Sequence, residues 1–175
     1  SAPDFETTTS VTATITISDG TNSSTQDITV EISDVNESPS ITSDNNFSVE
    51  EGTNTVGTIT TTDPENDSLT FSLAERRVTK FTIDQNGVLS FIATPDFEQP
   101  GDNDGSNTYF QTVIISDGEF EVTQDITIQV TDVNEAPVLN FSSDPNFEAK
   151  ENQNIAGAFS ATDPDGDSLT FSLGG

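Results

Sequence analysis

The sequence predicts an all-β protein built from antiparallel β-sandwiches arranged in tandem, and three observations support this class. Short runs alternate apolar and polar residues, as strands with one buried face do. The same motifs return after roughly one hundred residues, a period typical of a sandwich domain. No stretch of helical period is long enough to predict a useful amphipathic helix.

The internal repeat predicts how the chain is divided. Residues 62–73 recur as residues 162–173, and the acidic stretch at 33–39 recurs at 131–137. The repeat frame predicts three segments: the C-terminal half of a repeat at 1–38, a complete repeat at 39–137, and the N-terminal half of a third repeat at 138–175. The last segment of one chain would complete the first segment of a neighbour by head-to-tail strand exchange. The alternative is that the sequence is an excerpt of a longer continuous array.

The predicted strands follow one another along the chain. Residues 11–17 alternate valine, alanine and isoleucine with threonine, which is typical of a strand with one buried face. The pair Asn86-Gly87 between two such runs predicts a hairpin turn, since both residues tolerate positive φ. The other predicted strands cover residues 28–32, 69–73, 81–83, 88–91 and 126–130.

The composition excludes several classes of function. The formal net charge is −27, from 31 acidic and 4 basic residues, so nucleic acid and anionic membrane surfaces are not expected partners. The absence of cysteine and histidine removes disulfides, most zinc sites and most nucleophile–base pairs, and we expect no enzyme activity. No run approaches the ~18 apolar residues of a membrane helix. No signal peptide is visible, so we expect a piece of a longer exported chain.

Two acidic linkers carry the main chemical signal. Residues 33–39 and 131–137 each follow a strand-like run, place Asp, Asn and Glu within four residues, and end at a proline. Carboxylate, amide and carbonyl oxygens are the ligands that a hard cation such as Ca²⁺ prefers. Such a run would repel itself where two domains meet unless a cation lay within it. The linkers therefore predict calcium between the repeats.

Four further acidic motifs recur beside the linkers. One pair of acids alone is a weak signal, but five motifs in a fixed order, most of them doubled at one period, form a strong one. The motif residues are Glu51 and Glu151; Asp63, Glu65 and Asp67 with Asp163, Asp165 and Asp167; Asp4 and Glu6 with Asp96 and Glu98; and Asp19 with Asp117. An insertion after Glu98 adds a loop with Asp102 and Asp104, which we interpret as a solvated surface loop rather than a further ion site.

In this order the motifs resemble the cadherin repeat, in the form found in tandem arrays of large bacterial surface adhesins. The cadherin linker motif Asp-x-Asn-Asp-Asn-x-Pro is matched by residues 132–137, one residue shorter and with Glu135 in place of the second aspartate. The Asp-Arg-Glu motif is matched by residues 96–98, with Phe97 in place of arginine. The resemblance covers essentially the whole chain and implies immunoglobulin-like, cadherin-type Greek-key β-sandwiches.

The resemblance also implies which residues hold calcium at each junction between repeats. At the first junction they would be Asp4, Glu6, Asp34, Asn36, Glu37, Asp63, Glu65 and Asp117. At the second they would be Glu51, Asp96, Glu98, Asp132, Asn134, Glu135, Asp163 and Asp165. Strand exchange between chains would add Glu151 to the first set and Asp19 to the second.

The function implied by the resemblance is that of an extracellular, calcium-binding adhesion or structural module at a bacterial surface or secreted from it. Calcium would stiffen the array into a spacer or a filament-forming unit, with other copies of the chain, adjoining repeats or a cell-surface ligand as partners. The alternative is a homophilic or glycan-recognition module, although Tyr109 is the single tyrosine and tryptophan is absent. Paired carboxylates also hydrolyse glycosides, but these acids recur with the repeat as ligands would.

Overall fold

The computed structural model describes residues 2–75, 80–140, 151–152 and 159–173, and within them every regular element is a β-strand. The predicted all-β class is therefore confirmed. The described residues contain no helix that is long and apolar enough to cross a membrane. The strands are β1 Ser10–Ser18, β2 Ser23–Glu31, β3 Ser40–Ile41, β4 Asn46–Glu50, β5 Thr55–Thr58, β6 Thr61–Thr62, β7 Thr70–Leu73, β8 Phe81–Ile83, β9 Val88–Phe91, β10 Thr108–Ser116, β11 Glu121–Thr131, β12 Val138–Asn140 and β13 Ser160–Thr162.

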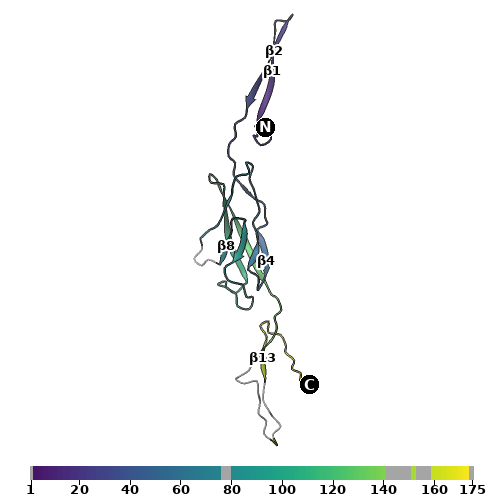
Figure 1. The fold of residues 1–175 in the computed structure, drawn as a ribbon, viewed down its shortest axis with the longest axis vertical. Helices are drawn as coiled ribbons and strands as arrows, with labels where there is room; N and C mark the ends of the chain where they lie inside the picture. The colour runs from purple at the N-terminus through teal and green to yellow at the C-terminus, as the bar shows by residue number, and fades with distance from the viewer. Residues whose placement is uncertain (1, 76–79, 141–150, 153–158, 174–175) are drawn as a thin grey trace.

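The middle of the chain forms a β-sandwich (Figure 1). One sheet has the strand order β4-β11-β10-β7, and the other has the order β5-β9-β8. The long hairpin β10–β11 organises the first sheet, with β7 antiparallel to β10 on one side and β4 parallel to β11 on the other. The short strands β3 and β6 pair with each other near the first linker. The first acidic linker leads into this sandwich before β3, and the second leads out of it after β11.

The core of the sandwich follows from the alternation seen in the sequence. Along β10 and β11 every second side chain turns inward, so that Val113, Ile115 and Ile128 are fully buried. The second sheet contributes Leu89 and the rings of Phe81 and Phe91, which pack against Tyr109. Burial of these branched and aromatic side chains supplies the main stabilisation of the body, since each contributes about 1.5–3 kcal/mol relative to exposure.

The hairpin between β8 and β9 is confirmed, but only one of the two residues expected to adopt a positive φ does so. Gly87 has a φ of 77°, as predicted, whereas Asn86 does not adopt a positive φ. Instead the carboxylate of Asp84 accepts hydrogen bonds from the backbone N–H groups of Asn86 and Val88, at 2.8 and 2.9 Å. A side-chain cap on the turn therefore replaces the second left-handed residue.

Two-stranded hairpins flank the sandwich, and the parts lie end to end in an elongated molecule (Figure 1). The hairpin β1–β2 precedes the first linker, and the pair β12–β13 follows the second. All residues of β1 and β2 are exposed, including Ile17 at 72%. The predicted strand at 28–32 is confirmed as β2, which ends one residue earlier, at Glu31. Glu51 directly follows β4, which is preceded by the short β3.

Candidate functional site

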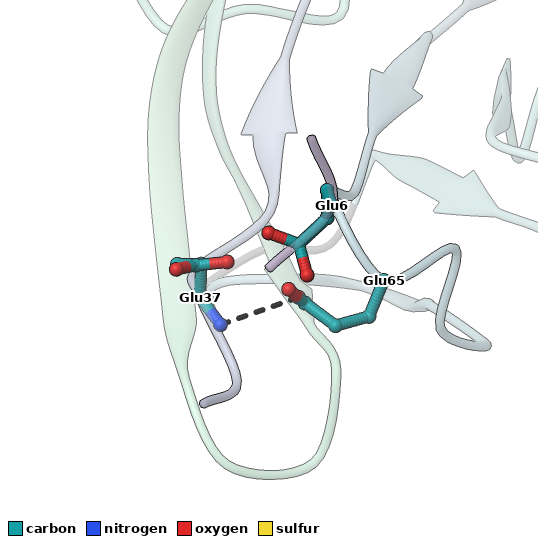
Figure 2. Close-up of side chains that lie close together, drawn as sticks. All are labelled: Glu6, Glu37 and Glu65. Atoms are coloured by element: carbon teal, nitrogen blue, oxygen red, sulfur yellow. Dashed lines mark hydrogen bonds between the residues drawn. The ribbon is translucent and has the colours of Figure 1, made fainter. Parts of the chain in front are cut away.

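Three glutamates from three parts of the chain meet at the first junction. Glu6 comes from the segment before β1, Glu37 from the linker, and Glu65 from the turn after β6 (Figure 2). One carboxylate oxygen of each lies within 4.8 Å of the others. The backbone N–H of Glu37 donates a hydrogen bond of 3.2 Å to Oε2 of Glu65, which ties the linker to the sandwich.

The short distances between the three carboxylates shift the pKa of each glutamate. A hydrogen bond between the side chains of Glu37 and Glu65, together with partial removal from water, raises the pKa of Glu37 to about 7. The same hydrogen bond lowers the pKa of Glu65, so the pair holds one proton between them. A backbone hydrogen bond lowers the pKa of Glu6, but burial and nearby carboxylates outweigh that bond and the pKa is raised. The carboxylates that act on Glu6 are those of Asp4, Glu65 and Asp34.

A second contact crosses the same junction. Nδ2 of Asn36 donates to Oδ2 of Asp117 at 3.0 Å, although 81 residues separate them. The other oxygen of Asp117 accepts the backbone N–H groups of Glu119 and Phe120, at 2.7 and 2.6 Å. Burial would raise the pKa of Asp117, but these hydrogen bonds outweigh it and lower the pKa. Asp117 is thus held ionised and faces the linker.

Asp63 and Asp163 are the first residues of the turns after β6 and β13. Each accepts a hydrogen bond from a backbone N–H group within its own turn. Oδ1 of Asp63 accepts the backbone N–H of Asp67 at 3.0 Å, and Oδ1 of Asp163 accepts that of Asp167 at 3.2 Å. In the first turn Oδ2 of Asp63 and Oε1 of Glu65 are shielded from solvent and have no hydrogen-bond donor among the described residues. A shielded carboxylate oxygen without a donor is costly, and a cation would satisfy it.

The second junction brings together two overlapping groups of acids. Glu51, Asp96 and Glu98 form one group, and Glu98 joins Asp132 and Asp165 in the other, each within 4.8 Å. Oε2 of Glu98 and Oδ1 of Asp165 are shielded and have no donor in the described parts of the chain. An open cavity of about 360 Å³ lies beside these groups. Its lining residues are Asp96, Glu98, Gln99, Glu135, Thr162, Asp163 and Pro164.

Glu51 is the most buried acid of this junction, with only 7% of its surface exposed. Its Oε2 accepts the backbone N–H of Phe97 at 2.8 Å, and its Oε1 accepts that of Val133 at 2.9 Å. One carboxylate therefore joins the end of β4 to the loop of residues 95–98 and to the linker. Since hydrogen bonds to a charged acceptor are the stronger ones, Glu51 fixes where both segments lie.

Three carboxylates of the second junction have raised pKa values. Burial raises the pKa of Glu98, and the charges of Glu51 and Asp132 add to the shift. Burial also raises the pKa of Asp132, helped by a hydrogen bond to Asp165. The pKa of Glu135 is raised by burial and then by Glu51 and Asp165. Like charges held this close favour either a proton or a cation among them.

The structure gathers most of the predicted ligands but leaves some apart. Asp4, Asp34 and Glu135 lie close enough to act electrostatically on the grouped acids. Asn134 is exposed, and its Nδ2 donates to the carbonyl of Glu135 at 3.1 Å. Asp19 caps the turn between β1 and β2 by accepting the N–H groups of Thr21 and Asn22. Neither Asp19 nor Glu151, which is exposed in a turn, belongs to an acid group of the described residues.

Gln99 and Thr162 were missed, although both line the cavity at the second junction. Nε2 of Gln99 donates to Oδ2 of Asp96 at 3.2 Å, and its backbone N–H donates to Oδ1 at 2.8 Å. The equivalent backbone bond is present in the first segment, where the N–H of Thr7 donates to Oδ1 of Asp4. In both segments the donor is a backbone N–H group, which any residue except proline provides. Comparing residue types between the repeats therefore could not identify this position.

The inserted loop is held by its own hydrogen bonds. Oδ2 of Asp102 accepts both the N–H and the hydroxyl of Ser106, at 2.8 and 3.0 Å, and Asp104 accepts the same N–H at 3.2 Å. Burial would raise the pKa of Asp102, but the bonds from Ser106 and Asp104 outweigh it and the pKa is lowered. This loop lies outside the acid groups of the two junctions.

Comparison with known proteins supports the fold. No family model and no curated protein matches the sequence. Among solved structures, the chain is similar to human protocadherin-24 EC1-2, form II, with a TM-score of 0.56 and 20% identity, covering 76% of this chain and 70% of that one. It is also similar to the protocadherin gammaB7 EC3-6 cis-dimer structure, with a TM-score of 0.58 and 19% identity over 92% of this chain and 45% of that one.

Mouse protocadherin-24 EC1-3 gives a TM-score of 0.53 and 19% identity, covering 94% of this chain and 59% of that one. The chain thus spans about half the length of two of these three structures, 45% and 59%. At such low identity the likeness shows the fold alone. It confirms the predicted cadherin-type β-sandwich.

Proposed function

We propose that the chain is an extracellular, calcium-binding adhesion or structural module, an array of repeats that Ca²⁺ stiffens at the junctions. The observation that carries this proposal is the convergence of acids from both sides of each linker, with shielded oxygens that have no donor among the described residues. The repeats are those predicted at 1–38, 39–137 and 138–175. The array serves as a spacer or a filament-forming unit of a surface protein.

The acid groups fit calcium. Two oxygens that are both bound to one Ca²⁺ at roughly 2.4 Å are at most about 4.8 Å apart, and the ligand oxygens of all three groups lie within 4.8 Å of one another. Calcium takes carboxylate, amide and backbone oxygens without demanding a strict octahedron, which suits mixed sets of this kind. The predicted ligands of the two junctions would hold it, led by the grouped acids Glu6, Glu37, Glu65, Glu51, Asp96, Glu98, Asp132 and Asp165. The bound ion would supply positive charge between carboxylates that otherwise repel.

Stiffening follows from where these ligands are anchored. Glu98 belongs to the central sandwich, Asp132 to the linker, and Asp165 to the segment beyond it, and these three acids form one group. An ion shared by all three parts removes the freedom of the linker to swivel. Without the ion, the same carboxylates push the parts away from one another. Extracellular modules bind calcium at roughly 10⁻⁴ to 10⁻³ M, so the stiff form belongs outside the cell.

The cellular setting of this proposal is the surface of a bacterium, as part of a secreted or surface-attached adhesin. A chain without cysteine depends on its core and on metal for stability, as many exported bacterial domains do. The partners are other copies of the chain, adjoining repeats and a ligand on another cell surface. The similarity of the fold to extracellular cadherin domains supports an adhesive module.

The glycan-recognition alternative is less well supported. Sugar binding favours an exposed aromatic platform, but Tyr109 is buried between Phe81 and Phe91. Homophilic recognition finds more support, because Phe110 on β10 and Ile92 after β9 are apolar side chains left exposed on the sandwich. A protein partner is therefore the second candidate.

Thermal unfolding tests the proposal. Millimolar Ca²⁺ should raise the midpoint by about 5–15 °C relative to chelator, and Mg²⁺ should have little effect, because binding to the folded state alone stabilises it. The double variant Glu98→Gln, Asp132→Asn should lose a large part of the shift. The control Asp44→Asn, which changes an exposed acid outside the three groups, should keep it. An equal midpoint with calcium and with chelator would overturn the proposal.

A further inference from the structure

One basic side chain lies beside a cavity and has no acidic partner in the described residues. Lys80 is the one basic residue in the described parts of the chain, and it is half-buried. The sequence holds 31 acidic residues, yet none of those described forms an ion pair with the ammonium group of Lys80. Because a charged group that is partly removed from water is normally paired, the missing partner indicates a place for an anion.

The cavity beside Lys80 lies on the central sandwich and has a volume of about 200 Å³. The backbone N–H of Ile92 donates to the carbonyl of Lys80 at 2.9 Å, which fixes Lys80 beside the end of β9. Much of the wall is apolar and comes from Phe91, Ile92, Ala93 and Pro95. Since a cavity of about 150 Å³ accepts benzene, this one has room for an apolar body of that size.

A second hydrogen-bond donor lines the same cavity. The hydroxyl oxygen of Tyr109 accepts the backbone N–H of Gly101 at 3.0 Å, and its own proton is donated to no group of the described residues. Burial raises the pKa of Tyr109, so the hydroxyl keeps this proton at neutral pH. A Cβ atom on Gly101 would lie 3.3 Å from Nζ of Lys80 and 3.5 Å from the hydroxyl oxygen of Tyr109, so the two donors flank one point.

We propose that this cavity binds a carboxylate carried on an apolar body of about the size of a benzene ring. The ammonium group of Lys80 would pair with the carboxylate, and the hydroxyl of Tyr109 would donate to one of its oxygens. The apolar body would pack against side chains such as Phe91 and Pro95. A sugar acid fits less well, because most of its hydroxyl groups would face these walls without hydrogen bonds.

Asp96 is the one acidic side chain that lines this cavity, and its charge opposes the binding of an anion. Both of its oxygens accept hydrogen bonds from Gln99, at 2.8 Å from the backbone N–H and at 3.2 Å from Nε2. Asp96 is also one of the acids grouped at the second junction, so a calcium ion bound there would offset its charge. The inference goes beyond the proposed calcium-binding function, because neither Lys80 nor Tyr109 is a predicted calcium ligand.

Titration of the chain with sodium benzoate, followed by ¹H–¹⁵N NMR, tests the proposal. In millimolar Ca²⁺ at neutral pH, the backbone amide signal of Gly101 should shift and saturate with a Kd of about 1 mM, because this N–H group donates to Tyr109 at the cavity. Benzyl alcohol carries the same ring without the charge and should bind at least about fivefold more weakly. Lys80→Gln should weaken the binding of benzoate by a similar factor.

Two further variants serve as controls. Thr82→Gln changes an exposed residue of β8 that does not line the cavity, so it should leave the Kd for benzoate unchanged. Asp96→Asn removes the opposing charge without any ion, so in chelator it should bind benzoate at least as tightly as the wild-type chain does in calcium. Thermal unfolding of each variant verifies that the central sandwich is intact. The calcium-dependent shift in midpoint is measured without benzoate, so the two proposals fail separately.

The carboxylate could come from a small free acid or from the C-terminal residue of a polypeptide, and two more ligands distinguish these sources. The peptide acetyl-Gly-Gly-Leu is compared with isocaproate, which is leucine without its amino group. Tighter binding of the peptide would identify the end of a polypeptide as the ligand, and tighter binding of isocaproate would identify a free acid.

Three results would overturn the proposal. The first is no saturable shift of the Gly101 signal up to about 20 mM benzoate, either for the wild-type chain in calcium or for Asp96→Asn in chelator. The second is an equal affinity of the wild-type chain and Lys80→Gln for benzoate. The third is an equal affinity of the wild-type chain for benzoate and benzyl alcohol.

Discussion

The backbone N–H of Glu135 donates a hydrogen bond to Oδ2 of Asp165 at 2.8 Å, and the first junction repeats this contact between Glu37 and Glu65 at 3.2 Å. In both places the linker glutamate is held by the third residue of the acidic turn that follows. The acid can be Asp or Glu, because the bond needs only a carboxylate within reach of the linker backbone. Each junction is thus closed by a protein contact, which leaves the remaining carboxylate oxygens for a cation.

The junctions differ in the role of the linker asparagine. Asn36 reaches Asp117 at the first junction, whereas Asn134 donates only to the carbonyl of the next residue. We expect Asn36→Ala to weaken calcium binding at the first junction about tenfold, because the orientation of Asp117 is lost. Asn134→Ala removes a predicted ligand oxygen but no contact to another acid, so it should weaken calcium binding at its own junction less than Asn36→Ala does at the first. Calorimetric calcium titration measures both, and equal effects would contradict the assigned role of Asn36.

Glu51 should be the acid whose loss costs the most stability. It is buried and accepts two backbone N–H groups, so Glu51→Ala should lower the free energy of unfolding by about 2–3 kcal/mol in saturating calcium. The neighbouring Glu50 is exposed, and Glu50→Ala should cost less than about 0.5 kcal/mol. Urea unfolding of both variants makes the comparison. A similar cost for the two would show that the bonds to Phe97 and Val133 contribute little.

Calcium binding at the first junction should depend on pH near neutrality. The pKa of Glu37 is raised from 4.5 to about 7, so between these values the closed junction holds a proton that the open linker has released. The stabilisation from this proton is fully present below about pH 4.5 and is lost as the pH rises through about 7. Calcium competes with the same proton, so its affinity should increase from about pH 6 to about pH 8.

Calorimetry in two buffers of different ionisation enthalpy measures this exchange. Binding at about pH 6 should release protons from the wild-type chain. Glu37→Gln is the control, because it cannot ionise and should remove the part of the release that arises at this site. Calcium binding to the wild-type chain without proton release would contradict the shared proton between Glu37 and Glu65.

Gly87 should be irreplaceable in the hairpin β8–β9. It has a φ of 77°, and a Cβ atom there would lie 2.4 Å from the carbonyl oxygen of Ile59. Gly105 has a similar φ of 70° but open space around it. We expect Gly105→Ala to cost about 1 kcal/mol from the backbone alone, and Gly87→Ala to cost more than about 3 kcal/mol. Thermal or urea unfolding separates the two, and equal costs would mean that the backbone near Ile59 yields easily.

The repeat made much of the candidate site predictable. Because the recurring acidic motifs follow the order of the cadherin repeat, that resemblance assigned ligands such as Glu6 and Glu65 to one junction before their positions were known, and the structure brings them together. The two hydrogen bonds of Glu51 could not be predicted, because they depend on how deeply the end of β4 is buried.

The fold was predictable for a related reason, except in one informative place. The inward alternation of β10 and β11 is visible in the residues themselves. The state of residues 170–173 is not, since the same four side chains form β7 elsewhere in the chain. A strand at an edge is determined by its neighbour as much as by its own sequence.

Small-angle X-ray scattering of the chain in millimolar calcium and in chelator tests the central claim most directly. The measurement is made at low protein concentration to suppress association between chains. With calcium we expect the scattering of a single stiff rod, whose maximum dimension matches the end-to-end arrangement of the three parts (Figure 1). With chelator the maximum dimension should shorten on average and the profile should show interdomain flexibility, because the carboxylates at each junction repel. Identical profiles in the two conditions would contradict a calcium-stiffened array.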